Sequence, residues 1–222
     1  RGIPTPPYLV IGPEDLAGLD GRPDLDALSY PFFLKLSHED ASVGIDGSNV
    51  VHDRTALAAR VRALIGRWDQ AVIAERYIAG REVNATVLGT GSHARLLPLH
   101  EIDFAAMPAG APHIVSYAAK WDEQHAEYAG TRPVPMAGVD ASVAAAIERA
   151  ALGAFAACGL RDYGRVDLRV DAAGVPWVID VNPNCDLSPD AGVARAGRAG
   201  VLDYPRLIRR VCELAWQRYL EA

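Results

Sequence analysis

Cysteine and lysine are both scarce in this chain of 222 residues, and long apolar runs are absent. The three cysteines, Cys158, Cys185 and Cys212, are odd in number, far apart and without the spacing of a metal site. A reduced, cytoplasmic compartment is therefore the simplest expectation. No apolar run approaches the length that a membrane-spanning helix needs. The chain opens without a charged and then apolar leader and without an initiator methionine, so we expect a piece of a longer protein.

The charged residues exclude several classes of function and single out two positions. The net charge is −6 and the two signs are interspersed, so no basic face for nucleic acid is expected. The six histidines lack the paired spacing of a zinc site, and neither a Gly-x-Ser-x-Gly elbow nor a Walker phosphate loop occurs. Twenty of the basic residues are arginine and only two are lysine, Lys35 and Lys120. These two lysines have two equally good explanations: chance retention, or a need for a compact ammonium group at each position.

Apolar periodicity predicts a mixed α+β fold built from antiparallel hairpins. Three longer helices are expected, capped or begun by Asp53, Asp140 and Pro205. Strands are expected at 31–36, 72–74, 83–89, 94–103, 164–170 and 178–182. Residues 105–135 are rich in proline, alanine and charge, which predicts a long functional loop. We expect two lobes that divide near residues 75–80.

The most informative segment is the predicted hairpin formed by 164–170 and 178–182. A tight turn at Ala173-Gly174 places Asp167 opposite Asp180 and Arg165 opposite Asn182. A four-residue loop shifts the pairing by one step but keeps the four polar groups on one face. Facing like charges destabilise a sheet, and carboxylate and amide oxygens are ligands that Mg²⁺ accepts beside phosphates. A metal–phosphate site is therefore expected, the alternative being an acidic strand face in water.

Two further features favour a phosphate or nucleotide ligand, and each also has a simpler explanation. The polar loop after Lys35 contains Ser42 and Gly44, whose small size lets backbone N–H groups wrap a phosphate. Taken alone this signal is weak, and a plain surface turn is the simpler explanation of the loop. Glu75 and Glu82 can accept hydrogen bonds from an adenine amino group and from ribose hydroxyls, although isolated carboxylates are commonly solvated charges.

Five spaced motifs that cover nearly the whole chain point to a known family. They are Pro-Phe-Phe-Leu-Lys35 with Ser42-Val43-Gly44, then residues 74–82, 117–120, 159–167 and 180–182. In this order they resemble the ATP-grasp superfamily and, within it, the D-alanine–D-alanine ligases. The resemblance implies an α+β ATP-grasp fold in which two lobes with antiparallel sheets clasp ATP. The small lobe is then residues 1–75, and the large lobe, with the metal-binding hairpin, is residues 76–222.

The same resemblance implies roles for individual residues. Lys35 and Lys120 contact phosphates, the 42–44 loop covers them, Glu75–Ile78 hold adenine and Glu82 holds the ribose. The implied ATP-binding set is Lys35, Ser42, Val43, Gly44, Glu75, Arg76, Tyr77, Ile78, Glu82 and Lys120. The implied ligands of one or two Mg²⁺ ions, with Mn²⁺ as an alternative, are Asp167, Asp180 and Asn182. Arg165 is the implied catalytic residue, facing the reacting carboxylate and its acyl phosphate.

The implied activity is an ATP-dependent carboxylate–amine ligase that forms a peptide-type bond. Its partners are ATP and small amino-acid or carboxylate substrates, with no nucleic acid and no membrane, and the chain is compatible with a homodimer. Three departures from the ligase pattern keep other readings open. Asp180 stands where the ligases usually carry glutamate, the loop 183–192 lacks their Pro-Gly and Ser-rich pattern, and their N-terminal domain has no counterpart here. The alternatives are a ligase for another amino or hydroxy acid and a nucleotide-binding module without turnover.

Overall fold

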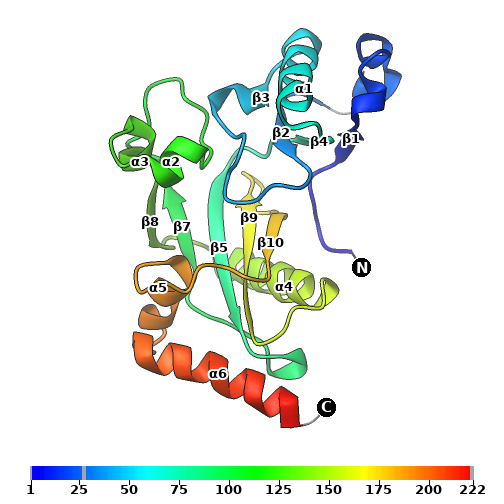
Figure 1. Cartoon of the computed structure of the whole chain (residues 1–222). Helices are drawn as coiled ribbons and strands as arrows, with labels where there is room; N and C mark the ends of the chain where they lie inside the picture. Colours follow the sequence, from blue (N-terminus) through cyan, green and yellow to red (C-terminus); the bar gives the residue numbers. More distant parts are fainter. Residues whose placement is uncertain (1, 27–28, 221–222) are drawn as a thin grey trace. The chain divides into compact units, whose positions relative to one another are not determined.

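The computed structural model describes residues 2–26 and 29–220, and the chain divides into two compact units. The first unit comprises Pro6–Tyr77 and Asp103–Arg132, and the second comprises Arg1–Thr5, Ile78–Ile102 and Pro133–Ala222. Figure 1 labels the α-helices and all strands except β6 as they are named below. Within the described ranges, no helix has both the length and the apolar character needed to cross a membrane.

The first unit is built on a four-stranded antiparallel sheet. The strand order is β1 (Tyr8–Ile11), β4 (Val72–Arg76), β2 (Phe32–Leu36) and β3 (Val50–Val51). Helix α1 (Arg54–Trp68) begins at the predicted cap, where the Asp53 carboxylate accepts a hydrogen bond of 2.8 Å from the Ala56 amide. The predicted helix and its cap are therefore confirmed. Its apolar side packs with the sheet residues into one core, because Leu57, Val61, Leu64, Phe32 and Leu34 are all fully buried.

Short helices fill the connections. The 3₁₀ helices are η1 (Pro13–Asp15), η2 (Leu19–Gly21), η3 (Pro23–Asp26), η4 (Gly47–Asn49) and η5 (Gly91–His93). The prediction of an irregular loop over 105–135 was wrong in part, because α2 (Tyr117–Trp121), α3 (Ala126–Gly130) and strand β8 (Arg132–Pro135) lie there. Caps that periodicity does not detect begin both helices: the Ser116 hydroxyl accepts from the Ala119 amide and the His125 ring accepts from the Glu127 amide.

The second unit contains a six-stranded antiparallel sheet with one apolar and one polar face. Along the sheet the strands are β10 (Pro176–Asn182), β9 (Tyr163–Val170), β5 (Arg81–Leu88), β7 (His100–Asp103) and β8, while β6 (Arg95–Leu96) also pairs with β5. Helix α4 (Ala141–Ala157) covers the apolar face. Asp140 is its N-cap residue by position, but the expected side-chain cap hydrogen bond is missing. Helices α5 (Gly192–Ala199) and α6 (Tyr204–Leu220) pack against each other in a smaller core.

The division between the units differs from the one expected from the sequence. It falls between Tyr77 and Ile78, within the expected 75–80 window, but residues 103–132 belong with the first unit rather than with the C-terminal part of the chain. Long-range hydrogen bonds hold them there: Ser42 Oγ donates to the Val115 carbonyl, and the Tyr117 amide donates to the Ile45 carbonyl, each at 2.9 Å. Lys120 is therefore in the same unit as Lys35.

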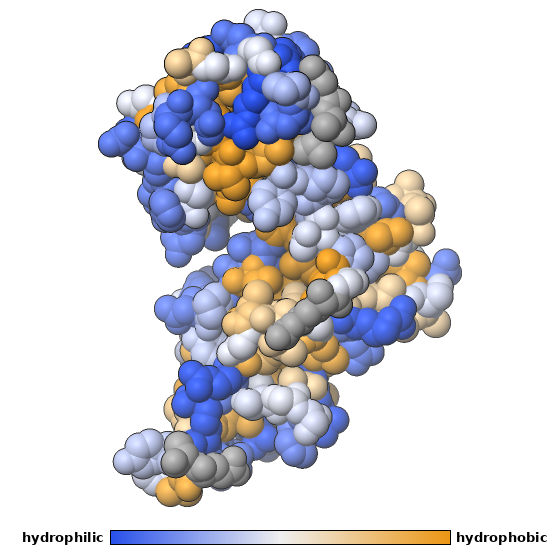
Figure 2. Space-filling model, turned by 90° about the vertical axis from the view of Figure 1, so that its right-hand side faces the viewer, coloured by the Kyte–Doolittle hydropathy of each residue, from blue (hydrophilic) through white to orange (hydrophobic). Residues whose placement is uncertain are grey.

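Each unit exposes some apolar surface of its own. On the face shown in Figure 2, apolar residues form separate areas among polar ones. The large exposed apolar side chains include Val10 on β1 of the first unit and the stacked pair Trp216 and Tyr219 on α6 of the second. Scattered exposure of this kind is ordinary for a globular protein.

Candidate functional site

The β9–β10 hairpin brings the four predicted polar residues to one face of the second unit. Asp180 is the register partner of Asp167, and Asn182 is the partner of Arg165, so the predicted pairing is confirmed. The connection differs from the predicted Ala173-Gly174 turn, because the last pair before it is Val170 with Pro176 and the loop is 171–175.

A β-bulge at Ile179 produces the confirmed pairing. Before the bulge Trp177 pairs with Arg169 and Val178 with Leu168, and the register shifts between Val178 and Asp180. Without the shift Ile179 would lie opposite Asp167, and Asp180 would point to the other face of the sheet, since side chains alternate along a strand. The bulge therefore places Asp180 on the polar face.

Asp167 is the centre of a hydrogen-bond network on this face. Arg165 donates to both of its carboxylate oxygens, at 2.7 and 2.8 Å, and Asn84 of β5 donates to Oδ1 at 2.9 Å. Burial by itself lowers the pKa of the Arg165 guanidinium, but the charge and hydrogen bonds of Asp167 outweigh it and the pKa is raised. Arg165 thus remains a cation and balances the buried Asp167.

The same face offers a set of oxygen donors for a divalent cation. Asn182 Nδ2 lies 3.2 Å from Asp167 Oδ2 and 3.0 Å from Asp180 Oδ2, so the three side chains converge on one point. Rotation of the Asn182 amide presents its oxygen there instead of its nitrogen. The described residues contain no group of three His, Cys, Asp or Glu side chains able to hold a metal. The donors that this site offers are two carboxylates and one amide oxygen. This donor set has the hard-oxygen chemistry of a Mg²⁺ site.

Glu82 lies on the same polar face, on β5, the strand that pairs with β9 of the hairpin. It is the register partner of Arg169, and Arg169 Nη2 lies 3.2 Å from its Oε2. Burial raises the pKa of the Glu82 carboxyl, while the charge of Arg169 opposes the rise.

In the first unit, two residues that were assigned separate roles form an ion pair. Lys35 on β2 and Glu75 on β4 lie 3.0 Å apart, from Nζ to Oε2, and the Glu75 side chain is only 10% exposed. Next along the chain, the Tyr77 amide donates to the Pro31 carbonyl at 2.8 Å, and its hydroxyl donates to the His113 carbonyl at 3.2 Å. Arg76 ends β4, and Ile78, which is buried, begins the next segment of the second unit.

The 42–44 loop has an unusual backbone and a defined anchor. Ala41, Ser42 and Gly44 all have positive φ, and a Cβ on Gly44 would lie 2.8 Å from Leu36 Cδ1. Val43 packs against the core of the unit. The sharp turn therefore depends on glycine at position 44.

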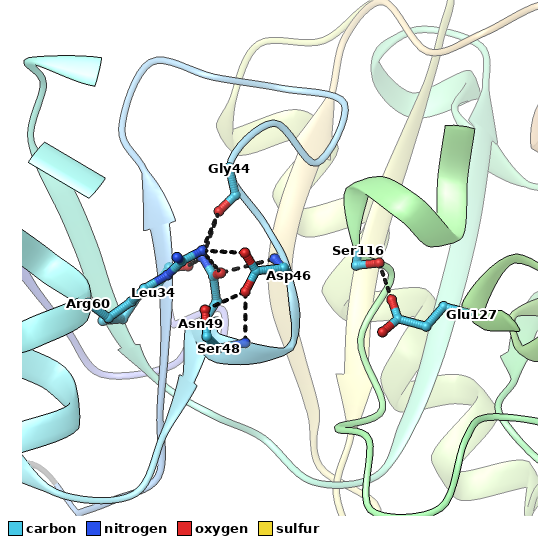
Figure 3. Close-up of polar contacts among 8 residues, drawn as sticks. All are labelled: Leu34, Gly44, Asp46, Ser48, Asn49, Arg60, Ser116 and Glu127. Atoms are coloured by element: carbon cyan, nitrogen blue, oxygen red, sulfur yellow. Dashed lines mark hydrogen bonds and ion pairs between the residues drawn. The ribbon is translucent and has the colours of Figure 1, made fainter. Parts of the chain in front are cut away.

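Asn49 and Arg60 hold the end of this loop, and the sequence analysis did not single out either residue. Asn49 Nδ2 donates to the Leu34 carbonyl at 2.6 Å and to the Gly44 carbonyl at 3.0 Å, and Arg60 donates to Asn49 Oδ1 at 2.6 Å (Figure 3). Asn49 is fully buried. A signal was present in the sequence, because Asp46 and Asn49 have the spacing of a capping box around η4.

Lys120 is carried by α2, which is attached to the same loop. The neighbouring Trp121 indole donates to the Ala41 carbonyl at 3.0 Å, and the Lys120 ammonium lies 5.7 Å from the centre of that ring. Ser116, the cap of α2, also donates to Glu127 of α3 (Figure 3). The backbone that carries Lys120 and the 42–44 loop thus form one structure within the first unit.

Comparison with known proteins identifies the family. A family model described as "D-ala D-ala ligase C-terminus" matches residues 1–213. The D-alanine–D-alanine ligase of Bordetella pertussis is 34% identical over 207 residues, which are 93% of this chain and 60% of the relative. "Uncharacterized protein y4sG" of Sinorhizobium fredii is 28% identical over 220 residues, which are 98% of this chain and 60% of that protein. The chain thus spans about 60% of the length of these curated relatives.

Solved structures agree on the fold. A D-alanine–D-alanine ligase of Bacillus anthracis complexed with ATP superposes with a TM-score of 0.75 at 22% identity, covering 99% of this chain and 63% of that one. The ligase of Coxiella burnetii gives 0.75 at 22% identity, covering 99% of this chain and 54% of that one. The expected α+β fold with antiparallel sheets is therefore confirmed as that of these ATP-grasp ligases. The match over residues 1–213 shows that this chain belongs to the family of D-alanine–D-alanine ligase C-terminal domains.

Proposed function

We propose that the chain is the ATP-binding part of an ATP-dependent carboxylate–amine ligase of the D-alanine–D-alanine ligase type. The observation that carries the proposal is the convergence of Asp167, Asp180 and Asn182 beside Arg165, in a chain of this family. This arrangement combines a cation-binding oxygen set with a fixed guanidinium. Phosphoryl transfer to a carboxylate needs both kinds of group.

The ATP-binding residues fall into two sets, one in each unit. In the first unit, Lys35 and Lys120 contact the phosphates and the 42–44 loop covers them with backbone N–H groups. Adenine is held by Glu75, Arg76, Tyr77 and Ile78. In the second unit, Glu82 accepts hydrogen bonds from the ribose hydroxyls. The ion pair between Lys35 and Glu75 supports this assignment by holding a phosphate contact and an adenine contact on one sheet face.

The metal ligands in the proposal are Asp167, Asp180 and Asn182. Mg²⁺ held there supplies positive charge that offsets the charge of the transferring phosphoryl group. The Asp180 side chain is exposed. Asp167 is buried and is held by Arg165 and Asn84.

The proposed reaction is the one that the resemblance to the ligases implies, and it requires no protein nucleophile. A substrate carboxylate oxygen attacks the γ-phosphorus of ATP, which gives an acyl phosphate and ADP. An amine then attacks the acyl carbon, and the tetrahedral intermediate expels phosphate to leave the amide. Arg165 faces the oxyanion of that intermediate, and its fixed charge stabilises it.

The loop between β10 and α5 favours a second candidate, the same chemistry on another amino or hydroxy acid. Asp186 Oδ1 accepts hydrogen bonds from the amide and the hydroxyl of Ser188, at 2.8 and 2.6 Å, so this serine is used inside the loop. Arg195 and Arg198 donate to the carbonyls of Asp190 and Pro189. The loop carries two aspartates, Asp186 and Asp190, and lacks a serine-rich pattern, so it suits an acceptor other than D-alanine.

Two measurements test the proposal. Titration calorimetry with Mg²⁺-ATP should show binding that Asp167→Asn and Asp180→Asn both weaken strongly, and wild-type affinity in both variants would contradict it. Phosphate release by the full-length parent protein, screened over D- and L-amino acids and hydroxy acids, then identifies the substrate. Tight ATP binding with no phosphate release for any carboxylate would favour a nucleotide-binding module without turnover.

A further inference from the structure

Arg169 and Glu82 form a buried ion pair on the polar face of the second-unit sheet. Their side chains are 4% and 11% exposed, and Arg169 Nη2 lies 3.2 Å from Glu82 Oε2. On the same face of the sheet, the neighbouring pair of these two strands is Asn84 with Asp167, two residues along, so the ion pair lies next to the network around Asp167. Neither the motifs nor the proposed reaction uses Arg169.

Arg169 also holds the backbone that leads into β5. Its Nη1 donates to the Gly80 carbonyl at 3.1 Å. Gly80 has a φ of +146°, and a Cβ there would lie 2.0 Å from the Val170 carbonyl oxygen, so this turn lies directly against the end of β9. One guanidinium therefore joins the turn before β5 to the carboxylate two residues later.

We infer that Arg169 is a positioning residue for the nucleotide, holding the Glu82 carboxylate oriented to accept hydrogen bonds from the ribose hydroxyls of ATP. The inference rests on the proposed function, in which Glu82 binds the ribose. The ion pair engages Oε2 of Glu82, and in this proposal Oε1 accepts hydrogen bonds from the hydroxyls.

The cost of burying this pair supports a specific role. A well-packed apolar pair at the same strand positions stabilises a sheet as well as a buried ion pair does, so stability alone does not explain the arginine. Burial raises the pKa of Glu82, and Arg169 opposes that rise. The other charged groups that act on Glu82, Arg165 and Asp167, have opposite signs and also come from β9. Only an ionised carboxylate is a pure acceptor for two hydroxyl donors.

The test compares ATP with 2′-deoxyATP, each bound with Mg²⁺ to the whole chain and measured by calorimetry. We expect the wild type to bind ATP about tenfold more tightly than 2′-deoxyATP, the size expected for one hydrogen bond to a charged group. In Arg169→Met the affinity for ATP should fall by a larger factor than the affinity for 2′-deoxyATP, which keeps only the 3′-hydroxyl, so the ratio drops to about 1–2. Arg169→Lys, which keeps the charge but not the planar fork, should give an intermediate ratio.

A matched control separates positioning from the general loss of an ion pair. Arg81 precedes Glu82, faces the opposite side of β5 and pairs with Glu101 at 2.7 Å. Arg81→Met should leave the ratio of the two affinities at its wild-type value. If Arg169→Met does not fold, the same criterion is applied to Arg169→Lys, where a ratio less than half of the wild-type value supports the inference.

Equal weakening of ATP and 2′-deoxyATP, with the ratio unchanged, would overturn the inference and show that Arg169 only packs. A wild-type ratio near 1 with clear ATP binding would also overturn it, because Glu82 then does not bind the ribose, while ATP binding itself survives. If the wild-type chain binds neither nucleotide, the proposed function fails together with the inference.

Discussion

Lys35 and Glu75 form an ion pair across neighbouring strands of the first unit, with 3.0 Å between Nζ and Oε2. The strand register explains the contact. Phe33 is the direct partner of Glu75 and Ile73 is the partner of Lys35, so the two charged side chains are diagonal neighbours on one face of the sheet. Any change at one of them therefore alters the electrostatics of the other.

Replacing Lys35 with methionine should lower the affinity for Mg²⁺-ATP at least about tenfold. The substitution removes a cation from the phosphates in the proposed complex, and it removes the charge that balances the mostly buried Glu75 carboxylate. Calorimetry measures the effect. Arg62→Met is the matched control, because Arg62 pairs with Asp20 on the exposed surface of the same unit, at 2.7 Å, and should leave the affinity unchanged. Equal affinities in both variants would contradict a phosphate role for Lys35.

Asp180 allows the metal proposal to be tested without damage to the fold. The side chain is exposed, so Asp180→Asn should change the free energy of unfolding by no more than about 0.5 kcal/mol. We expect it to lower the affinity for Mg²⁺-ATP at least about tenfold, because an amide is a weaker ligand for Mg²⁺ than a carboxylate. Asp180→Glu keeps the charge and should retain most of the binding. The metal role is wrong if Asn and Glu at this position bind Mg²⁺-ATP as tightly as the wild type.

Asn49 should be the most sensitive polar residue of the 42–44 loop anchor. In Asn49→Ala the carbonyls of Leu34 and Gly44 lose a fully buried donor, which costs about 2–3 kcal/mol of unfolding free energy. Urea unfolding followed by tryptophan fluorescence measures this cost. Ser48→Ala, one residue earlier and exposed, should cost at most about 0.5 kcal/mol. Similar losses in the two variants would show that the anchor is less important than its geometry indicates.

Cys185 should be the slowest of the three thiols to react. Burial raises its pKa from 9.0 to about 11, and the nearby Arg165 only partly opposes the rise. At pH 8 the thiolate fraction is then about a hundredfold lower than for a thiol at the reference value, because each pKa unit is a factor of ten. Exposed Cys158 and Cys212 should be alkylated by iodoacetamide first, as mass spectrometry of peptides can show. Labelling of Cys185 at the rate of the other two would contradict its burial.

Local sequence patterns predicted the elements whose causes are local. Asp53 begins α1 because a carboxylate satisfies the amides of the first helical turn, and this requires only the next three residues. The predicted pairing of Asp167 with Asp180 is correct, although it assumed a two-residue turn and the structure reaches it through a longer loop and a bulge. In contrast, helices α2 and α3 were missed because each has only five residues, too few to show helical periodicity. Helix α2 also depends on a distant contact, the bond from Trp121 to the Ala41 carbonyl 80 positions away.

By itself, the sequence determined the antiparallel α+β architecture, the order of the motifs and which polar residues face the same side of a strand, because hydrophobic alternation and capping act over a few residues. Only the tertiary structure decided that a bulge at Ile179 aligns Asp180 with Asp167, that Lys120 belongs with Lys35, and that Arg169 holds Glu82. These relationships depend on packing and on electrostatic pairing between distant segments. The energy of such contacts arises only when the folded chain brings those segments together.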